Sequence, residues 1–372
     1  MSKKNSMGSV YISYPHDDYA ALQAMVQMLK DHYEVRYDQG FGVGKRYRQE
    51  LENNLDDSDA YICIMNENYV KAPSCMHELN LVLNHLNHKK IIFAYVGNKN
   101  RVINGHAKGM QLLLKAMPSV EVGEIGTLYD NHSRFIDLID NDKLEKPIVE
   151  FGRYMQQKPN VFERLTGSIL EGGKTPIEWL ALEREGNSLL LISKYALDCK
   201  RYNEKSEPVT WETCTLRKWL NEEFLGKAFT KEQQQMIETT AVKAEKNPRY
   251  DTDPGNDTED KVFLLSVQEA EKYFASDKER ICKLTPHMKE AKFGMKEAKF
   301  RRHQEKYLPY VIEAAALIML ERCYWWLRSP GDGQRNAAFV SKDFRSFGWS
   351  SVFADEIGVR PACRINLESY KL

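Results

Sequence analysis

The segment Ser74 to Glu78, SCMHE, places a hydroxyl, a thiol, an imidazole and a carboxylate at the start of a predicted helix. The helix dipole favours a carboxylate in the first turn and keeps it ionised. Such an anion can stabilise positive charge that develops on a substrate, and it can equally cap a helix without any catalytic role. The residues alone leave both interpretations of Glu78 open.

A second segment with chemical potential is YDQGFGVGKRY, Tyr37 to Tyr47, which holds three glycines and two basic residues. Glycine-rich loops that cradle phosphate groups read GxGxxG or end in GK followed by Ser or Thr. Here the glycines read GxGxG, and neither Ser nor Thr follows Lys45. We therefore expect either a loop with another task or a flexible surface turn.

Metal ligation is the third chemistry that the side chains suggest. His77, His85 and His88 lie in or near the same predicted helix, but the last two fall at its end, where cations complement the helix dipole. No third ligand is apparent for a zinc ion. We expect no metal site among these histidines or at the acidic turn of residues 56–59.

Length and composition indicate a two-domain protein of the ordinary globular class. The 372 residues contain 53 basic and 53 acidic side chains, so the overall charge favours no particular partner. Neither a signal peptide nor a membrane-spanning segment is apparent. The seven cysteines include no CxxC pair, which is typical of reduced thiols, and we expect a cytoplasmic protein.

The first 145 residues alternate strand and helix signals. Strands are expected at residues 9–14, 34–38, 61–65, 91–96 and 119–123, and helices at 17–33, 47–55, 74–86 and around Phe135. This alternation predicts an α/β domain with a parallel sheet that helices cover on both faces. Ligands of such sheets bind beyond the carboxyl ends of the strands.

The character of the sequence changes near Pro147, so we divide the chain into residues 1–146 and 147–372. The second part has short mixed elements, which predict an α+β domain with antiparallel strands. The polar, acidic segment 244–261 is expected to be a solvated connection. The hexapeptide MKEAKF at 288–293 recurs at 295–300 and favours a solvated helix that lies on the core over a patch that binds nucleic acid or another anion.

The motifs of the first part, taken in order, resemble the Toll/interleukin-1 receptor (TIR) domain, particularly its bacterial branch. They are VYISYPHDD, YDQGFGVG followed by Tyr47, YICIMNENY and APSCMHELNLVLNH. The resemblance covers about residues 8 to 145 and implies a flavodoxin-like fold with five parallel strands. Asn66, where the family often has Ser, and Pro15 depart from the pattern.

Many bacterial TIR domains are NAD+ hydrolases or cyclases that break the bond between nicotinamide and ribose. The resemblance implies that Glu78 is the catalytic glutamate, because the oxocarbenium-like transition state needs a carboxylate near the ribose. The positions implied to contact NAD+ are Ser13, Tyr14, Gly44, Tyr47 and Cys75. The glycine segment corresponds to the BB loop, which in this family gates the active site and takes part in contacts between TIR domains.

The second part resembles a bacterial domain family of unassigned function, through FGRYMQ, PIEWLALE, LLISKYALD, LRKWLN, KVFLLS, WWLRSPG and GVRPA. Such domains look related to the formylglycine-generating-enzyme and C-type-lectin-like fold, which includes ligand-binding receptors. From the residues themselves, Trp325 and Trp326 are expected in the core. Arg328 and Arg360 are expected to be paired or bonded to backbone.

An aromatic segment at residues 337–356 mixes large rings with serines and charges. This composition is typical of an adaptable recognition surface and equally of loop and strand packing. The rings considered for ligand recognition are Phe344, Phe347, Trp349 and Phe353.

Together these features predict a defence or signalling protein. Its TIR enzyme, when clustered, cleaves NAD+ through Glu78, and its C-terminal domain senses a ligand and controls clustering. NAD+ is expected as a substrate, with no further cofactor, membrane or nucleic acid partner. Two alternatives remain: a non-catalytic TIR scaffold, and a retroelement-diversified binding protein with TIR as its output. The sequence does not decide whether the product is linear or cyclic.

Overall fold

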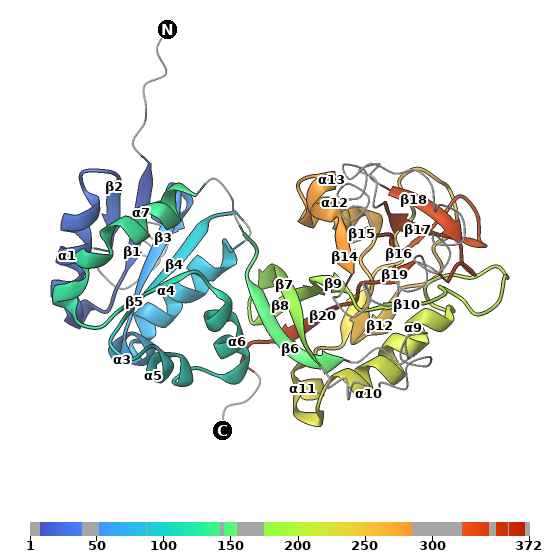
Figure 1. Ribbon diagram of the computed structural model, residues 1–372, viewed down its shortest axis with the longest axis horizontal. Coiled ribbons are helices and arrows are strands. Elements are labelled where there is room, and N and C mark those ends of the chain that lie inside the picture. Colours follow the sequence, from blue (N-terminus) through green and yellow to red (C-terminus); the bar gives the residue numbers. More distant parts are fainter. Residues whose placement is uncertain are drawn as a thin grey trace, which may run out of the picture. The chain divides into compact units, whose positions relative to one another are not determined.

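The structure is a computed structural model of the chain. It describes residues 8–38, 52–86, 88–141, 145–154, 175–284, 322–341, 347–355 and 357–368. Gly44, Tyr47, Phe344 and both MKEAKF repeats therefore lie outside the described residues. The chain forms two compact units, one of Met1–Val149, Ala181–Leu189 and Asn366–Leu372 and the other of Glu150–Leu180 and Leu190–Ile365. Figure 1 colours the chain along its sequence.

Strands and helices alternate through the first 140 residues, as the periodicity predicts. The strands are β1 (Ser9–Ser13), β2 (Glu34–Tyr37), β3 (Ala60–Met65), β4 (Lys90–Val96) and β5 (Ser119–Val122). The helices are η1 (His16–Asp18), α1 (Tyr19–Leu29), α3 (Glu67–Lys71), α4 (Pro73–Asn84), α5 (Lys99–Asn104), α6 (Lys108–Ala116), η2 (Ile125–Thr127), η3 (Tyr129–Asn131) and α7 (His132–Asp140).

The five strands form one parallel sheet in the order β2-β1-β3-β4-β5. Two of its three inner strands, β1 and β3, are buried along their whole length, and the third, β4, is buried except at its ends. Parallel strands that are covered on both faces read as continuous apolar runs, which explains why SVYIS and AYICIM are recognisable in the sequence. The expected flavodoxin-like sheet is confirmed.

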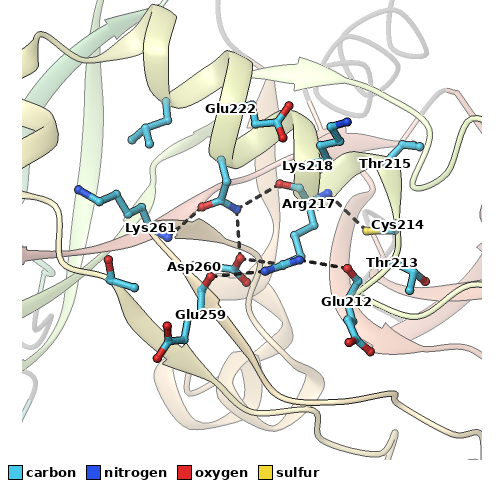
Figure 2. A pocket seen from close by; sticks show the side chains of 13 residues that line it. Glu212, Thr213, Cys214, Thr215, Arg217, Lys218, Glu222, Glu259, Asp260 and Lys261 are labelled. Atoms are coloured by element: carbon cyan, nitrogen blue, oxygen red, sulfur yellow. Dashed lines mark hydrogen bonds and ion pairs between the residues drawn. The ribbon is translucent and has the colours of Figure 1, made fainter.

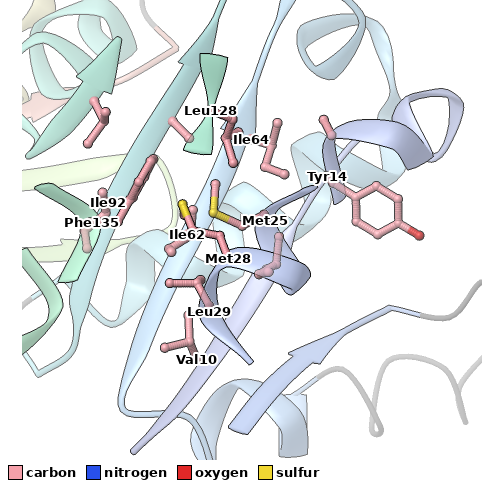
Figure 3. Packing of buried hydrophobic residues seen from close by; sticks show 14 of the residues in the cluster. Val10, Tyr14, Met25, Met28, Leu29, Ile62, Ile64, Ile92, Leu128 and Phe135 are labelled. Atoms are coloured by element: carbon pink, nitrogen blue, oxygen red, sulfur yellow. The ribbon is translucent and has the colours of Figure 1, made fainter. Parts of the chain in front are cut away.

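The core on one face of this sheet is continuous, and Figure 3 shows part of it. Alternate residues of three strands pack there, such as Ile12, Ile62 and Ile92, because successive strand side chains point to opposite faces. They meet Met25 of α1 and Phe135 of α7. On the other face α4 packs against β1, α3 against β3 and α5 against β4.

The second unit is built from short elements. Apart from Ile148, Val149, Ala181–Leu189 and Asn366, which belong to the first unit, its strands are, in chain order, β6 (Ile148–Tyr154), β7 (Thr175–Glu185), β8 (Ser188–Ser193), β9 (Tyr195–Ala196), β10 (Asp198–Cys199), β11 (Thr240–Val242), β12 (Thr258–Asp260), β13 (Val262–Phe263), β14 (Cys282–Leu284), β15 (Arg322–Cys323), β16 (Trp325–Pro330), β17 (Asn336–Val340), β18 (Phe347–Ser351), β19 (Gly358–Val359) and β20 (Ala362–Asn366). Its helices are α9 (Thr215–Trp219), the π-helix η4 (Leu220–Phe224), α10 (Leu225–Ala228), α11 (Lys231–Met236), α12 (Val267–Tyr273) and α13 (Asp277–Arg280).

Within the described ranges these strands form sheets in the orders β10-β19-β16-β17-β18, β13-β20-β8-β7-β6, β15-β14-β9 and β11-β12. Antiparallel pairs such as β16 with β17 and β17 with β18 dominate, as an α+β domain predicts. Parallel pairs also occur, between β14 and β9 and between β16 and β19.

Tryptophans fill the core of this unit, as expected for Trp325 and Trp326, which are both fully buried. A buried indole needs an acceptor for its N–H. Trp325 Nε1 donates to the carbonyl oxygen of Arg280 at 3.0 Å, and Trp326 Nε1 to that of Lys200 at 2.9 Å. Trp179 likewise donates to the carbonyl oxygen of Phe151 at 2.7 Å.

Arg328 is paired, as its burial requires. Its Nη2 lies 2.9 Å from Glu269 Oε1, Nη1 donates to the Leu264 carbonyl at 2.9 Å, and Nε to the Lys243 carbonyl at 3.2 Å. Nη1 also forms an ion pair with Glu269 Oε2.

The prediction of a solvated connection at residues 244–261 is partly wrong. The segment ends in strand β12, which pairs with β11, and its Asp260 is buried. Polarity misled the sequence reasoning, because a buried carboxylate looks like an exposed one until its donors are known.

Candidate functional site

The predicted catalytic glutamate lies beside the carboxyl end of β1. In the strand order β2-β1-β3-β4-β5 the chain reverses direction of winding between β1 and β3, and doubly wound sheets bind ligands at this point. Ser13 is the last residue of β1, and Glu78 lies on α4, which packs against that strand. The fold therefore brings together two residues that are 65 positions apart in the sequence.

A chain of hydrogen bonds holds the Glu78 carboxylate. Ser13 Oγ donates to Glu78 Oε2 at 2.7 Å, and Ser13 Oγ lies 2.8 Å from the hydroxyl oxygen of Tyr69. A serine hydroxyl carries one proton, so when that proton is given to the carboxylate the Tyr69 hydroxyl must be the donor to Ser13. The exposed fractions of Tyr69, Ser13 and Glu78 are 0%, 1% and 2%. The site is therefore a water-excluded polar chain.

Tyr69 is in turn held by the start of α3. Asn66 caps this helix, since its Oδ1 accepts from the backbone N–H groups of Asn68 at 3.0 Å and Tyr69 at 2.9 Å. Its Nδ2 donates to Asp18 Oδ2 at 2.5 Å. Asn is as good a helix cap as Ser, which explains how Asn66 substitutes for the residue that the motif usually has.

Cys75 and Tyr14 line the same end of β1. Cys75 Sγ donates to the carbonyl oxygen of Tyr14 at 3.4 Å. The Tyr14 hydroxyl donates to the carbonyl oxygen of Asp38, where β2 has ended, at 3.1 Å. Figure 3 shows the Tyr14 ring at the border of the apolar cluster. Both residues therefore tie β1 to its neighbours, and their contact with a substrate stays a prediction.

The acid–base properties of this site follow from burial. Burial, with a smaller effect of the Glu78 charge, raises the pKa of the Cys75 thiol to about 12. Burial likewise holds the pKa of the Tyr69 hydroxyl well above its usual value. At neutral pH both groups are protonated, so Cys75 is no nucleophile and Tyr69 remains a hydrogen-bond donor.

His77 and His85, on and just after α4, have different surroundings. His85 forms an ion pair with Asp56 at 3.8 Å and packs its ring against Tyr61. His77 Nε2 is buried and has no hydrogen-bond partner among the described residues. No group of three metal-ligating side chains comes together within the described ranges.

A polar crevice of about 550 Å³ opens in the second unit, and Figure 2 shows it. Its floor is Asp260, which is 2% exposed. Asp260 accepts from Arg217 Nε at 2.7 Å, Trp211 Nε1 at 3.0 Å and Thr258 Oγ1 at 2.7 Å. The exposed residues that line the crevice around Asp260 carry charges of both signs: Lys218, Glu222 and Glu259.

The aromatic segment places three of its four rings on described residues. Trp349 on β18 is 42% exposed and Phe353 is 40% exposed. Trp349 Nε1 donates to the hydroxyl of Tyr250 at 3.2 Å, and the Arg201 guanidinium carbon lies 3.7 Å from the centre of the Phe353 ring. The Arg280 guanidinium carbon lies 5.3 Å from the centre of the Phe347 ring. Phe347 and Trp349 lie on β18, an edge strand of its sheet, and Phe353 lies in the turn that follows; Trp349 and Phe353 expose a large part of their surface.

A five-stranded parallel sheet with a buried carboxylate beside its topological switch point defines the first unit as a flavodoxin-like α/β domain. The TIR-domain family matches residues 10–113, and the family described as "Domain of unknown function (DUF6273)" matches residues 186–367. The chain therefore carries a TIR domain followed by a DUF6273 domain. No curated protein matches the chain.

Two solved structures are similar to parts of the chain. One is the Clostridium botulinum CMP N-glycosidase BcmB, with 12% identity and a TM-score of 0.27, which covers 34% of this chain and 98% of its own. The other is the translation elongation factor SelB from Methanococcus maripaludis in complex with the GTP analogue GppNHp. It has 10% identity and a TM-score of 0.28, and the match covers 54% of this chain and 45% of that one.

Sequence reasoning missed two residues of these sites. Tyr69 belongs to the YICIMNENY motif, so its place was visible in the sequence, but its bond to Ser13 depends on the packing of α3. Asp260 had no sequence signal, because it follows other acidic residues in a polar segment.

Proposed function

We propose that the TIR domain breaks the bond between nicotinamide and ribose in NAD+, with Glu78 as the catalytic carboxylate. The observation that supports this proposal is the bond from Ser13 to Glu78 Oε2, at the end of the sheet where doubly wound folds bind ligands. The SCMHE segment supplies the glutamate in the position that the TIR family uses for this reaction.

In this reaction the electron pair of the broken bond leaves with the nicotinamide nitrogen, and positive charge develops on the ribose. A carboxylate stabilises that charge most strongly where water is excluded. Ser13 and Tyr69 then act as positioning residues, because they hold the carboxylate in one orientation before the substrate arrives. A water molecule or a second group of the substrate completes the reaction, giving a linear or a cyclic product.

Burial of Glu78 sets a condition on this proposal. With 2% of its surface exposed, the carboxylate reaches a substrate only after neighbouring segments move. We propose that self-association of TIR domains provides this opening, which makes activity depend on protein concentration.

The test is nicotinamide release from NAD+ by the full chain, at high concentration and with forced dimerisation. Glu78→Gln is the variant of choice, because it keeps the size of the side chain and its ability to accept from Ser13 but removes the charge. Release by the wild type that vanishes in Glu78→Gln supports the enzyme. Equal release by both proteins, or none under forced dimerisation, refutes it.

A non-catalytic scaffold is the second candidate, and the burial of Ser13 and Glu78 favours it. A scaffold tolerates Glu78→Gln but loses self-association when the BB loop is changed, as in Gly44→Pro. Self-association is expected of both functions, so nicotinamide release, measured beside sedimentation of both variants and the wild type, separates them: only the enzyme releases nicotinamide when it is associated.

For the DUF6273 domain we propose ligand sensing on a lectin-like fold. The crevice above Asp260 and the exposed rings of Trp349 and Phe353 support a binding role. If the domain is diversified, sister sequences differ mainly within residues 337–356. Sequence variation that is uniform along the whole domain contradicts the hypothesis of a diversified binding domain.

A further inference from the structure

Arg360 is a buried cation in the DUF6273 domain. It is 2% exposed, and its guanidinium carbon lies 5.0 Å from the ring centre of Trp325 and 5.1 Å from that of Phe274. Its Nε donates to the carbonyl oxygen of Ser193 at 2.8 Å, while Nη1 has no hydrogen-bond partner among the described residues. A charge that is taken out of water in this way requires an anion nearby.

Two thiols are the ionisable groups on which this charge acts. Cys282 on β14 and Cys323 on β15 occupy directly opposite positions of two antiparallel strands. They are 1% and 0% exposed, and the Arg360 charge acts on both. Among the described side chains, no carboxylate forms an ion pair with Arg360 within 4.0 Å. Cys282 is therefore the group best placed to supply the missing negative charge.

The surroundings of the Cys282 sulfur suit either protonation state. As a neutral thiol it donates to the carbonyl oxygen of Lys283 at 3.3 Å, and the Lys194 carbonyl lies at 4.0 Å. As a thiolate it accepts a hydrogen bond from the Cys323 thiol and a backbone hydrogen bond at Ala196.

The balance of these effects distinguishes Cys282 from other cysteines of the chain. Burial alone raises the pKa of Cys282, but the bond from Cys323, the Arg360 charge and the Ala196 backbone bring it below its usual value. Burial without such partners raises the pKa of Cys363 far above that value. Cys363 is equally buried, so it is a matched internal control.

We propose that Cys282 and Cys323, directly opposite each other on β14 and β15, form an oxidation site in which Cys282 reacts with hydrogen peroxide as the thiolate, the form that the Arg360 charge favours. The sulfur attacks one peroxide oxygen, the O–O bond breaks, and Cys282 becomes a sulfenic acid while hydroxide leaves. The Cys323 thiol then attacks the oxidised sulfur, forms the disulfide and releases water. Two thiols lose two electrons in total, and one peroxide molecule is reduced.

Access to the site requires no large opening. Hydrogen peroxide is close to water in size, and local openings of a native protein admit such molecules. Reactive cysteines lie in electropositive and partially exposed surroundings, whereas buried structural cysteines are inert. Cys282 has the electropositive neighbour but is 1% exposed, so its oxidation proceeds through such local openings. This contrast predicts selective oxidation at Cys282 within the same folded domain that protects Cys363.

The test uses the reduced full chain, with hydrogen peroxide added stepwise and the cysteines then identified by alkylation and peptide mass spectrometry. The expected first product is a linked Cys282–Cys323 peptide, with Cys363 still open to alkylation after unfolding. In Cys323→Ser, dimedone should label Cys282 as the trapped sulfenic acid. Cys363→Ser should oxidise like the wild type.

Arg360→Gln should slow the oxidation of Cys282, because loss of the cation lowers the thiolate fraction, by about tenfold for each pKa unit that the thiol rises, and Arg360→Lys should recover part of the rate. If Arg360→Gln fails to fold, the pH profile of the wild type decides. A pH midpoint of Cys282 oxidation that lies below the midpoint of the same thiol in the urea-unfolded chain supports the proposal. A midpoint at or above that of the unfolded chain, or a Cys282 rate equal to that of Cys363, overturns the proposal.

Discussion

Replacing Ser13 with Ala removes the hydroxyl that joins Tyr69 to Glu78. The lost bond from Ser13 Oγ to Glu78 Oε2 is 2.7 Å long and buried, and the proposed mechanism requires this carboxylate to be charged. Hydrogen bonds to charged groups contribute about 1.5 to 3 kcal/mol. If the whole contribution acts in the transition state, the rate of nicotinamide release falls about 10- to 160-fold, because each 1.36 kcal/mol is a factor of ten.

Ser9→Ala is the matched control for this change. Ser9 lies at the other end of β1, is 7% exposed, and its hydroxyl lies 3.0 Å from both the Asp57 carbonyl and Asp59 Oδ2. Both variants lose a hydroxyl from the same strand, so both should lower the free energy of unfolding, but only Ser13→Ala should lower kcat. The assay is nicotinamide release at saturating NAD+, beside urea unfolding of each variant. Equal kcat values for Ser13→Ala and Ser9→Ala would refute the positioning role of Ser13.

Three further predictions concern single side chains. Tyr69→Phe removes the donor to Ser13 and should lower the free energy of unfolding by about 1 kcal/mol. It should also slow nicotinamide release, but less than Ser13→Ala does. If neither the stability nor the release rate changes, the proposed chain of hydrogen bonds is contradicted. Burial lowers the pKa of His106 to about 4, so the folded chain disfavours the protonated form. The stability that comes from keeping His106 neutral is fully present above pH 6.5 and is lost as pH falls toward 4, by up to about 3 kcal/mol. In His106→Asn the free energy of unfolding, measured in urea, should therefore differ less between pH 7 and pH 4.5 than it does in the wild type. Asp260→Asn leaves Arg217 without its buried anion and should cost about 3 to 5 kcal/mol by urea unfolding, whereas Asp257→Asn on the exposed surface should not change stability measurably.

The sheet of the TIR domain was predictable because its inner strands are buried on both faces. An apolar run such as YICIM predicts a buried strand, and the helices between the strands have apolar residues at helical spacing. The residues at which the helices begin and end were harder to predict. The helix expected at 17–33 is α1, Tyr19–Leu29, preceded by the short η1, because Asp17 and Asp18 favour a turn before the regular helix begins.

In the DUF6273 domain the sequence indicated which residues form the core but not which groups they bond to. Trp325 and Trp326 were expected inside, since large aromatic rings contribute most when buried. Which carbonyl groups would accept from their indoles was not predictable. The strand that ends in Asp260 was missed for the same reason, because its donors come from Trp211, Arg217 and Thr258, and two of these lie more than 40 positions away.

By itself the sequence determined the alternation of strands and helices and the placement of Glu78 near the start of a helix. Periodicity and helix signals are local, so a short window of residues contains them. Only the tertiary structure decided that Ser13 and Tyr69 hold that carboxylate, and that Cys282 lies opposite Cys323 near Arg360. Hydrogen bonds and charge interactions act over a few ångströms in space, and the fold alone brings distant positions of the chain that close.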